Sequence, residues 1–148
     1  MTQKLKLLSP LHKATRLVGT YLQPRCAELG VSNPEGHLLS YLQSYGPCSI
    51  TRLHEVFGHR RSTLTSMLDR LEARSLIRRE LDPGDRRSFQ VSITAGGRRT
   101  AGRLRTVLEE LESDVLGRVS NQDLAGFAAV MAAIAHVTNA RAPGKEEE

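Results

Sequence analysis

The sequence is poor in aromatic residues and in cysteine: it has no tryptophan, three tyrosines, three phenylalanines and two cysteines. Cys26 and Cys48 stand far apart and form neither a C-x-x-C nor a His-rich pattern, so we expect reduced packing residues rather than a disulfide framework or a zinc site. No run of about 18 apolar residues is present, which argues against a membrane span. The first residues also lack the apolar core of a signal peptide, and we predict a cytoplasmic protein with no membrane partner.

Motifs of catalysis are missing as well. The chain contains no G-x-S-x-G, no phosphate-binding loop and no H-E-x-x-H. Its five histidines do not stand with cysteines or carboxylates at the spacing of metal ligands. We therefore predict that the chain is not an enzyme and that it holds neither a metal nor a cofactor.

Basic residues are what the chain has in excess, with 21 Lys and Arg against 16 Asp and Glu and a net charge of +5. Three of the acids are Glu146, Glu147 and Glu148 at the end of the chain, so the rest is more basic than the total suggests. A basic body favours a polyanionic partner such as nucleic acid, but an excess of this size also fits an ordinary solvated surface. Charge alone leaves both interpretations open.

Helical patterns occupy the first third of the chain. Apolar positions recur with helical spacing over residues 4–29, and Pro24 should kink or divide this helix because it removes a backbone donor. A short second helix follows, for which we expect Asn33 as the cap, Pro34 at the first helical position and Gly46 at the end.

The middle of the chain is expected to fold as two helices and a hairpin. Ser49 should cap a third helix that ends at Gly58 and turns four side chains inward: Ile50, Leu53, Val56 and Phe57. The fourth helix carries a narrow apolar stripe: Leu64, Met67, Leu68 and Leu71. Residues 76–81 and 88–94 then read as antiparallel strands around a turn at Pro83 and Gly84. The inward side chains of the second strand are Phe89, Val91 and Ile93.

The last third is helical again, from residue 95 to about 119 and then from Ser120, whose spacing to Asp123 resembles a capping box. The final helix should bury a long apolar set: Leu124, Phe127, Val130, Met131, Ile134 and Val137. A core of this size cannot surround such a helix alone, so we expect the terminal helices to pack together and to pair with a second subunit. Residues 141–148 should form a disordered tail.

Two short helices joined by a tight turn match a helix-turn-helix, whose second helix enters the DNA major groove. The side chains expected to contact bases or phosphates there are Arg60, Arg61, Ser62, Thr63, Thr65, Ser66 and Arg70. Alternatively, the hydroxyls are helix caps and the arginines are simply solvated. Arginines at a helix N-terminus oppose the helix dipole, however, which favours an anion such as a phosphate at that position.

Residues from about 29 to 101 resemble the winged helix-turn-helix of the MarR family of bacterial transcriptional regulators. The resemblance rests on "STLTSMLDRLEARSLIRRELDPGDRRSFQVSITAGGRR", above all on Asp85-x-Arg87 followed by "VSIT" and Gly97. It implies a mainly α fold with a small β-hairpin wing. Residues 31–94 would form the DNA-binding lobe, and residues 1–30 and 95–140 a helical dimerisation region.

The resemblance also implies a homodimer that binds a pseudo-palindromic operator in double-stranded DNA, with a recognition helix in each major groove and a wing in each minor groove. Arg87, with Arg86 as neighbour, would lie at the minor groove. Asp85 would support the wing or orient an arginine such as Arg70 or Arg87. The sequence departs from the family at Ser75, where Gly is common and where we expect an uncomfortable backbone, and at Arg60, where a polar or acidic cap is common.

Many members of the family bind an aromatic or phenolic effector, which would make this chain a repressor relieved by a ligand rather than an activator. Candidate contacts are His12, Arg16, Tyr21, His37 and Tyr41, each of which also fits surface or core packing. One alternative is redox regulation through Cys26 or through Cys48, whose pKa a helix N-terminus would lower. Another is a winged-helix module that binds protein or RNA. The operator, the regulated genes and the effector are not readable.

Overall fold

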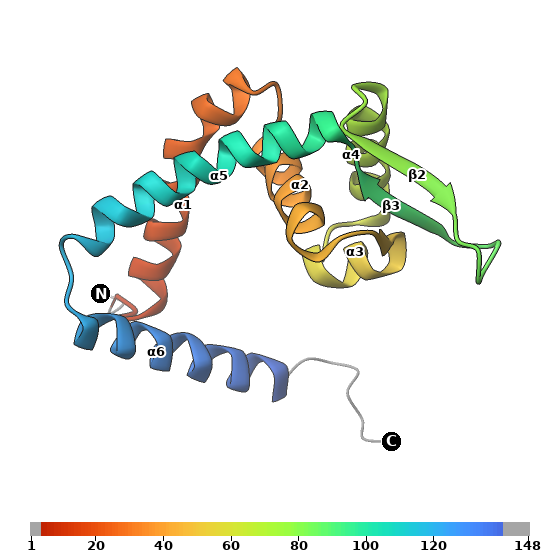
Figure 1. The fold of residues 1–148 in the computed structure, drawn as a ribbon. Coiled ribbons are helices and arrows are strands. Elements are labelled where there is room, and N and C mark those ends of the chain that lie inside the picture. Colours follow the sequence, from red (N-terminus) through yellow and green to blue (C-terminus); the bar gives the residue numbers. More distant parts are fainter. Residues whose placement is uncertain (1–3, 141–148) are drawn as a thin grey trace. The chain divides into compact units, whose positions relative to one another are not determined.

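The computed structural model describes residues 4–140, which form six helices and one small three-stranded sheet (Figure 1). The elements are α1 Leu8–Glu28, α2 Asn33–Tyr45, β1 Cys48–Ser49, α3 Ile50–Phe57, α4 Arg61–Ala73, β2 Ile77–Leu81, β3 Phe89–Ile93, α5 Ala95–Leu116 and α6 Asn121–Ala140. The chain divides into two compact units, one reaching to Leu108 and the other starting at Glu109. The tail predicted for residues 141–148 lies outside the described residues.

The sheet is antiparallel, and β3 lies between β1 and β2. Val91 stands opposite Cys48 on one side and opposite Arg79 on the other, and its side chain is fully buried. The hairpin of β2 and β3 is the predicted one. Strand β1 was missed because two residues are too short to show an alternating pattern.

The unit that reaches to Leu108 contains a complete apolar core. Leu38, Leu39, Leu42 and Leu53 have no exposed surface, and the four leucine and methionine side chains of the α4 stripe are at most 3% exposed. These positions confirm the predicted stripes of α2 and α4. Two predicted inward side chains are wrong: Val56 is 39% and Phe89 44% exposed, because each lies at the outer end of its element.

Two helix boundaries differ from the predictions. Pro24 does not divide α1, which continues to Glu28; the position is exposed, so the carbonyl that loses its helical donor is open to water. The cap of α2 is Ser32 and not Asn33. The Ser32 hydroxyl accepts from the Glu35 amide at 3.3 Å and donates to the Glu35 carboxylate at 2.8 Å, an arrangement that resembles a capping box except that the carboxylate bonds the hydroxyl and not the Ser32 amide.

Helix α6 is preceded by the predicted capping box, since the Ser120 amide donates to Asp123 at 2.8 Å and the Asp123 amide donates to the Ser120 hydroxyl at 3.1 Å. Within the single chain its apolar side chains are not buried. Phe127 is 60% and Val137 47% exposed, and the other four are exposed or half-buried. Of the helices within residues 4–140, none is long and apolar enough to cross a bilayer.

Candidate nucleic-acid interface

A tight turn joins α3 to α4. Ser49 caps α3 by accepting from the Arg52 amide at 3.1 Å, and Gly58 ends the helix with a φ of 63°, a left-handed conformation that glycine adopts without steric cost. Helix α4 begins only three residues later, at Arg61. Its four buried apolar side chains fix which face of α4 turns away from the core.

The outward face of α4 is polar and unoccupied. The side chains it presents are all exposed: Arg61, Ser62, Thr63, Thr65 and Ser66. Thr65 donates to the Arg61 carbonyl at 2.9 Å, whereas within residues 4–140 no hydrogen bond engages the hydroxyls of Ser62, Thr63 and Ser66. These three hydroxyls therefore do not act as caps and remain available to a partner.

The N-terminus of α4 is strongly basic. Arg60 occupies the cap position but makes no side-chain capping bond, and the first turn contains no acidic residue. Among the described residues, no carboxylate lies within 4.0 Å of the guanidinium groups of Arg60 and Arg61. Positive side chains thus add to the positive end of the helix dipole, an arrangement that attracts anions.

Arg70 points to α2 rather than to the wing. Its Nε lies 3.6 Å from Oε1 of Glu35, whose side chain is only 8% exposed and also accepts from the Ser32 hydroxyl. Of the alternatives predicted for Asp85, which were to support the wing or to orient Arg70 or Arg87, the contact with Arg70 is not present among the described residues, because Arg70 pairs with Glu35. Glu35 was not singled out from the sequence; its place three residues after Ser32 was the available signal.

Asp85 lies within the turn of the wing. Its Oδ1 accepts from the Arg87 amide at 3.0 Å, and its own amide and carbonyl bond to Asp82 and Ser88 at 3.3 and 3.0 Å. The Arg86 and Arg87 side chains on the same turn are exposed. The arrangement leaves two arginines at the tip of a hydrogen-bonded loop.

Asp82 makes more side-chain bonds in the wing than Asp85 does. One carboxylate oxygen accepts from the Gly84 amide at 2.8 Å, and the other accepts from the Gln90 amide group at 3.0 Å. The Gln90 bond, then the backbone bond from Gly84, lowers the pKa of Asp82 below its ordinary value. We missed this residue, although an aspartate before Pro-Gly is a common turn signal.

Arg79 on β2 connects the wing to α4. Its guanidinium lies 2.7 Å from Asp69 and 3.0 Å from Glu72, and its backbone amide donates to Glu72 at 2.9 Å. The hydrogen bonds from Arg79 lower the pKa of Glu72. This cluster was not predicted, because the three residues lie on two elements whose packing is not visible in the sequence.

Ser75 joins α4 to β2 with a φ of 57°. The prediction of an uncomfortable backbone at this position is confirmed, because a non-glycine residue rarely adopts the left-handed region. The Thr94 hydroxyl donates to the Ser75 carbonyl at 2.6 Å and closes this connection.

The five candidate effector contacts are not assembled into one site. His12 and Arg16 are exposed on α1, and Tyr21 lies against the Arg25 guanidinium at 3.7 Å. Tyr41 contacts two aromatic rings of its own lobe, Tyr45 and Phe57. Of the five, His37 alone lines a described cavity, of about 40 Å³, with Cys26 and Asn33 among its neighbours.

Neither cysteine is an activated thiol. Burial raises the pKa of Cys26, and burial likewise raises the pKa of Cys48, where the positive charge of Arg52 offsets only part of the effect. The lowered pKa expected for Cys48 at the start of α3 is therefore wrong. A raised pKa leaves less thiolate at neutral pH and disfavours the redox alternative. Within residues 4–140, no group of three metal-ligating side chains is present.

A helix-turn-helix followed by a hairpin that pairs with a third short strand defines the winged helix-turn-helix class. Residues 31–89 match the profile of the MarR family. The match assigns this segment, about two fifths of the chain, to a MarR-family domain.

Several curated relatives are regulators. The chain is 36% identical to the transcriptional regulator HosA of Escherichia coli O111:H- over 63 residues, which are 43% of this chain and only 47% of HosA. It is 29% identical to the transcriptional repressor NicR of Pseudomonas putida over 59% of this chain and 55% of NicR. The chain thus matches about half the length of these relatives.

Solved structures share the fold over nearly the whole chain. The complex of MepR from S. aureus with DNA has a TM-score of 0.81 at 15% identity, covering 90% of this chain and 98% of MepR. A mutant MarR from E. coli complexed with operator DNA has a TM-score of 0.77 at 18% identity, covering 88% and 94%. At these identities the likeness concerns the fold.

Proposed function

We propose that this chain binds a pseudo-palindromic operator in double-stranded DNA as a homodimer and represses transcription until a small effector releases it. The observation that carries the proposal is the outward face of α4, where exposed arginines stand beside hydroxyls that no group of the described chain engages. Hydroxyls and arginines are suited to base edges and phosphates, and the face lacks the bulky apolar groups that would keep a helix out of the major groove.

The wing supports the same reading. Arg86 and Arg87 are exposed on a loop that Asp82 and Asp85 hold by hydrogen bonds, and arginines presented in this way read the width and negative potential of a minor groove. MepR and MarR, whose folds are similar, have been solved bound to DNA.

The homodimer rests on α6. Its apolar stripe is exposed in the single chain, from Leu124 to Val137, and a second copy would cover it. Two recognition helices in one dimer would then meet half-sites about 34 Å apart, one turn of DNA.

Selection of bound duplexes from random DNA tests the operator. We expect an enriched sequence with inverted half-sites, and an affinity that falls steeply with salt because each phosphate contact adds about −0.9 to the slope of log K against log salt. Enrichment of no palindromic sequence would reject specific operator binding. A protein or RNA partner would instead leave duplex binding weak at every salt concentration.

The effector is tested separately by titrating a panel of aromatic acids into the complex with the selected duplex. Release by one of them, with half-saturation unchanged at two protein concentrations, would support a ligand-relieved repressor. If no compound changes the affinity, the effector part of the proposal fails while operator binding stands.

A further inference from the structure

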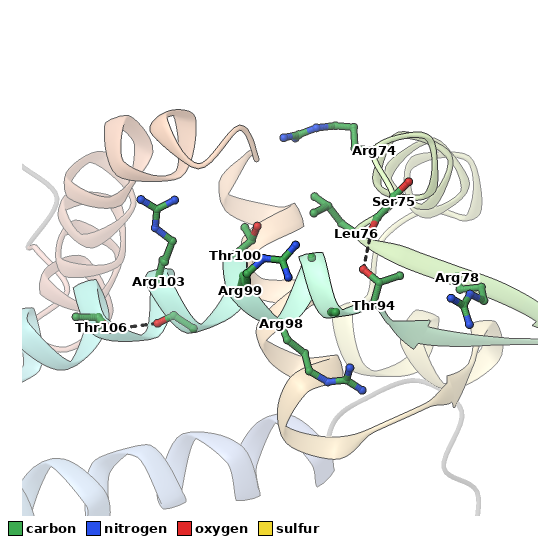
Figure 2. A pocket seen from close by; sticks show the side chains of 13 residues that line it. Arg74, Ser75, Leu76, Arg78, Thr94, Arg98, Arg99, Thr100, Arg103 and Thr106 are labelled. Atoms are coloured by element: carbon green, nitrogen blue, oxygen red, sulfur yellow. Dashed lines mark hydrogen bonds between the residues drawn. The ribbon is translucent and has the colours of Figure 1, made fainter.

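A large cleft of the lobe lies away from the outward face of α4. It is an open cleft of about 1090 Å³ formed by the end of α4, the start of β2 and the first half of α5 (Figure 2). Five arginines line it: Arg74, Arg78, Arg98, Arg99 and Arg103. The rest of its lining is threonine, serine, glycine, alanine and one leucine, with no acidic and no aromatic side chain.

This cleft is distinct from the candidate DNA interface. Helix α4 has 13 residues, so about 20 Å separates the basic N-terminus at Arg61 from the Arg74 end. The cleft is lined by Thr94 and Ala95, where β3 leads into α5, whereas Arg86 and Arg87 lie in the turn that joins the other ends of β2 and β3. One DNA duplex on the face of α4 and the wing tip would therefore leave the cleft open.

The positive charge in the cleft is not compensated within the described chain. Arg78 pairs with Glu80 at 3.8 Å in an exposed position. For Arg99 and Arg103, no carboxylate of residues 4–140 lies within 4.0 Å, and the two stand four residues apart on one helix, where like charges destabilise. Arg98 also lies at the end of the first turn of α5, where positive charge opposes the dipole.

Several of these groups converge. Figure 2 shows Arg99 and Arg103 projecting from one side of α5, with Arg74 extending from the end of α4 toward the same side and Arg98 on the other side. The Arg74 guanidinium passes so close to Gly30 that a Cβ there would collide with it. Gly30, which has a φ of 75° and no side chain, therefore leaves space for the Arg74 guanidinium.

We propose that this cleft binds an oligophosphate, meaning a small anion with several linked phosphate groups. Guanidinium groups bind phosphate oxygens in pairs of parallel hydrogen bonds, and the Thr100 hydroxyl beside them adds a neutral donor. The absence of an aromatic side chain in the lining means that the site recognises phosphates and offers no ring for stacking. This proposal does not depend on the proposed operator binding, because the cleft would bind an oligophosphate in the absence of DNA.

Calorimetric titration of the full chain with inorganic tripolyphosphate, in the absence of DNA, tests the site. The variant R99Q/R103Q removes two cleft charges at exposed positions and should weaken binding by about tenfold or more, the effect of losing charged hydrogen bonds. The matched control R60Q/R61Q removes the same charge from the N-terminus of α4 and should change the affinity by less than about twofold. Circular dichroism and the melting temperature confirm that both variants are folded.

Several results would overturn the proposal. They are no measurable binding by the parent chain, an equal loss in both variants, and a cleft variant that loses affinity for a random duplex while tripolyphosphate does not bind. The last result would mean that the cleft is a contact for DNA phosphates. R74Q alone should weaken tripolyphosphate binding severalfold, and an unchanged affinity in both R74Q and R99Q/R103Q would place the anion elsewhere.

ATP as a second ligand separates the sources of the phosphates. Equal affinities for ATP and tripolyphosphate support a site that binds the phosphate chain alone, and tighter binding of ATP supports the same site with a nucleoside added. Binding of ATP that R99Q/R103Q does not affect, together with no binding of tripolyphosphate, would contradict the proposal.

Discussion

Helices α4 and α6 both carry apolar stripes, but only α4 buries its stripe within the chain. The four large apolar side chains of α4 are at most 3% exposed, whereas Phe127 on α6 is 60% exposed. The polar groups differ in the same way. Arg79 is paired with Asp69 and Glu72, while the described chain supplies no carboxylate to Arg60 and Arg61. Groups satisfied within the chain maintain the fold, and groups left unsatisfied indicate where partners bind.

The largest expected effect is on stability and concerns a buried side chain of α4. Leu68→Ala removes a side chain that is 1% exposed and should lower the free energy of unfolding by about 2–5 kcal/mol, through lost burial and a cavity. Urea unfolding followed by circular dichroism measures it. Leu81→Ala, at a 56% exposed position, serves as the control and should cost less than about 1 kcal/mol. Equal losses in the two variants would break the distinction between buried and exposed positions.

The next effect concerns assembly rather than folding. Phe127→Glu places a charge on the exposed stripe of α6 and should raise the dissociation constant of the proposed dimer by about a hundredfold, because a carboxylate buried without a partner is costly. Light scattering after size exclusion would then show a monomer. Ala129→Glu, on the other side of the helix, should remain dimeric. A Phe127→Glu variant that stays a dimer would place the subunit interface elsewhere.

A third prediction concerns the wing. Arg87→Ala should weaken operator binding by about tenfold and make the slope of log K against log salt shallower by about 1, without changing stability. Fluorescence anisotropy at several salt concentrations measures both. Arg118→Ala, an exposed arginine outside the lobe, is the control with the same loss of charge. Identical salt slopes for the parent and Arg87→Ala would remove the wing from the mechanism.

The smallest effect is on the satisfied ion pairs. The pKa of Glu72 is lowered below its ordinary value of 4.5, so its contribution to stability is present above that pH and is lost as the pH falls through the folded-state pKa. Glu72→Gln should therefore be less stable than the parent by up to about 1 kcal/mol at neutral pH, and the gap should shrink in acid. Glu80→Gln, which loses only the exposed pair with Arg78, should show no such gap. A gap that is constant with pH would contradict the assignment.

Local signals were readable from the sequence, and contacts between elements were not. The α4 stripe, the Ser49 cap and the Ser120–Asp123 box were predicted correctly because spacing within a few residues decides them. Strand β1 was not predicted, because its two residues are recognised as a strand only by their pairing with β3. Ser32 and Asn33 are both good caps before a proline, so the choice between them was ambiguous.

The candidate site divides in the same manner. The exposed hydroxyls and arginines of α4 follow from its buried stripe, and the sequence therefore predicts which face is outward. The partners of Arg70 and Arg79 depend on how α4 packs against α2 and β2, which no periodicity encodes. The arginine cleft was missed for a related reason, because its lining comes from two segments, 74–78 and 94–106, that meet only in the folded chain.

The bonds from Arg79 to Asp69 and Glu72 have a consequence for how an operator would be tuned. They tie β2 to α4, and in the proposed operator complex they would limit how far the wing and α4 can move apart to fit a misplaced half-site. One base pair inserted at the centre of the operator shifts a half-site by about 3.4 Å and turns it by about 35° around the duplex. In the proposed complex, a lobe with these ion pairs would select operators by the spacing between their half-sites as well as by their base sequence.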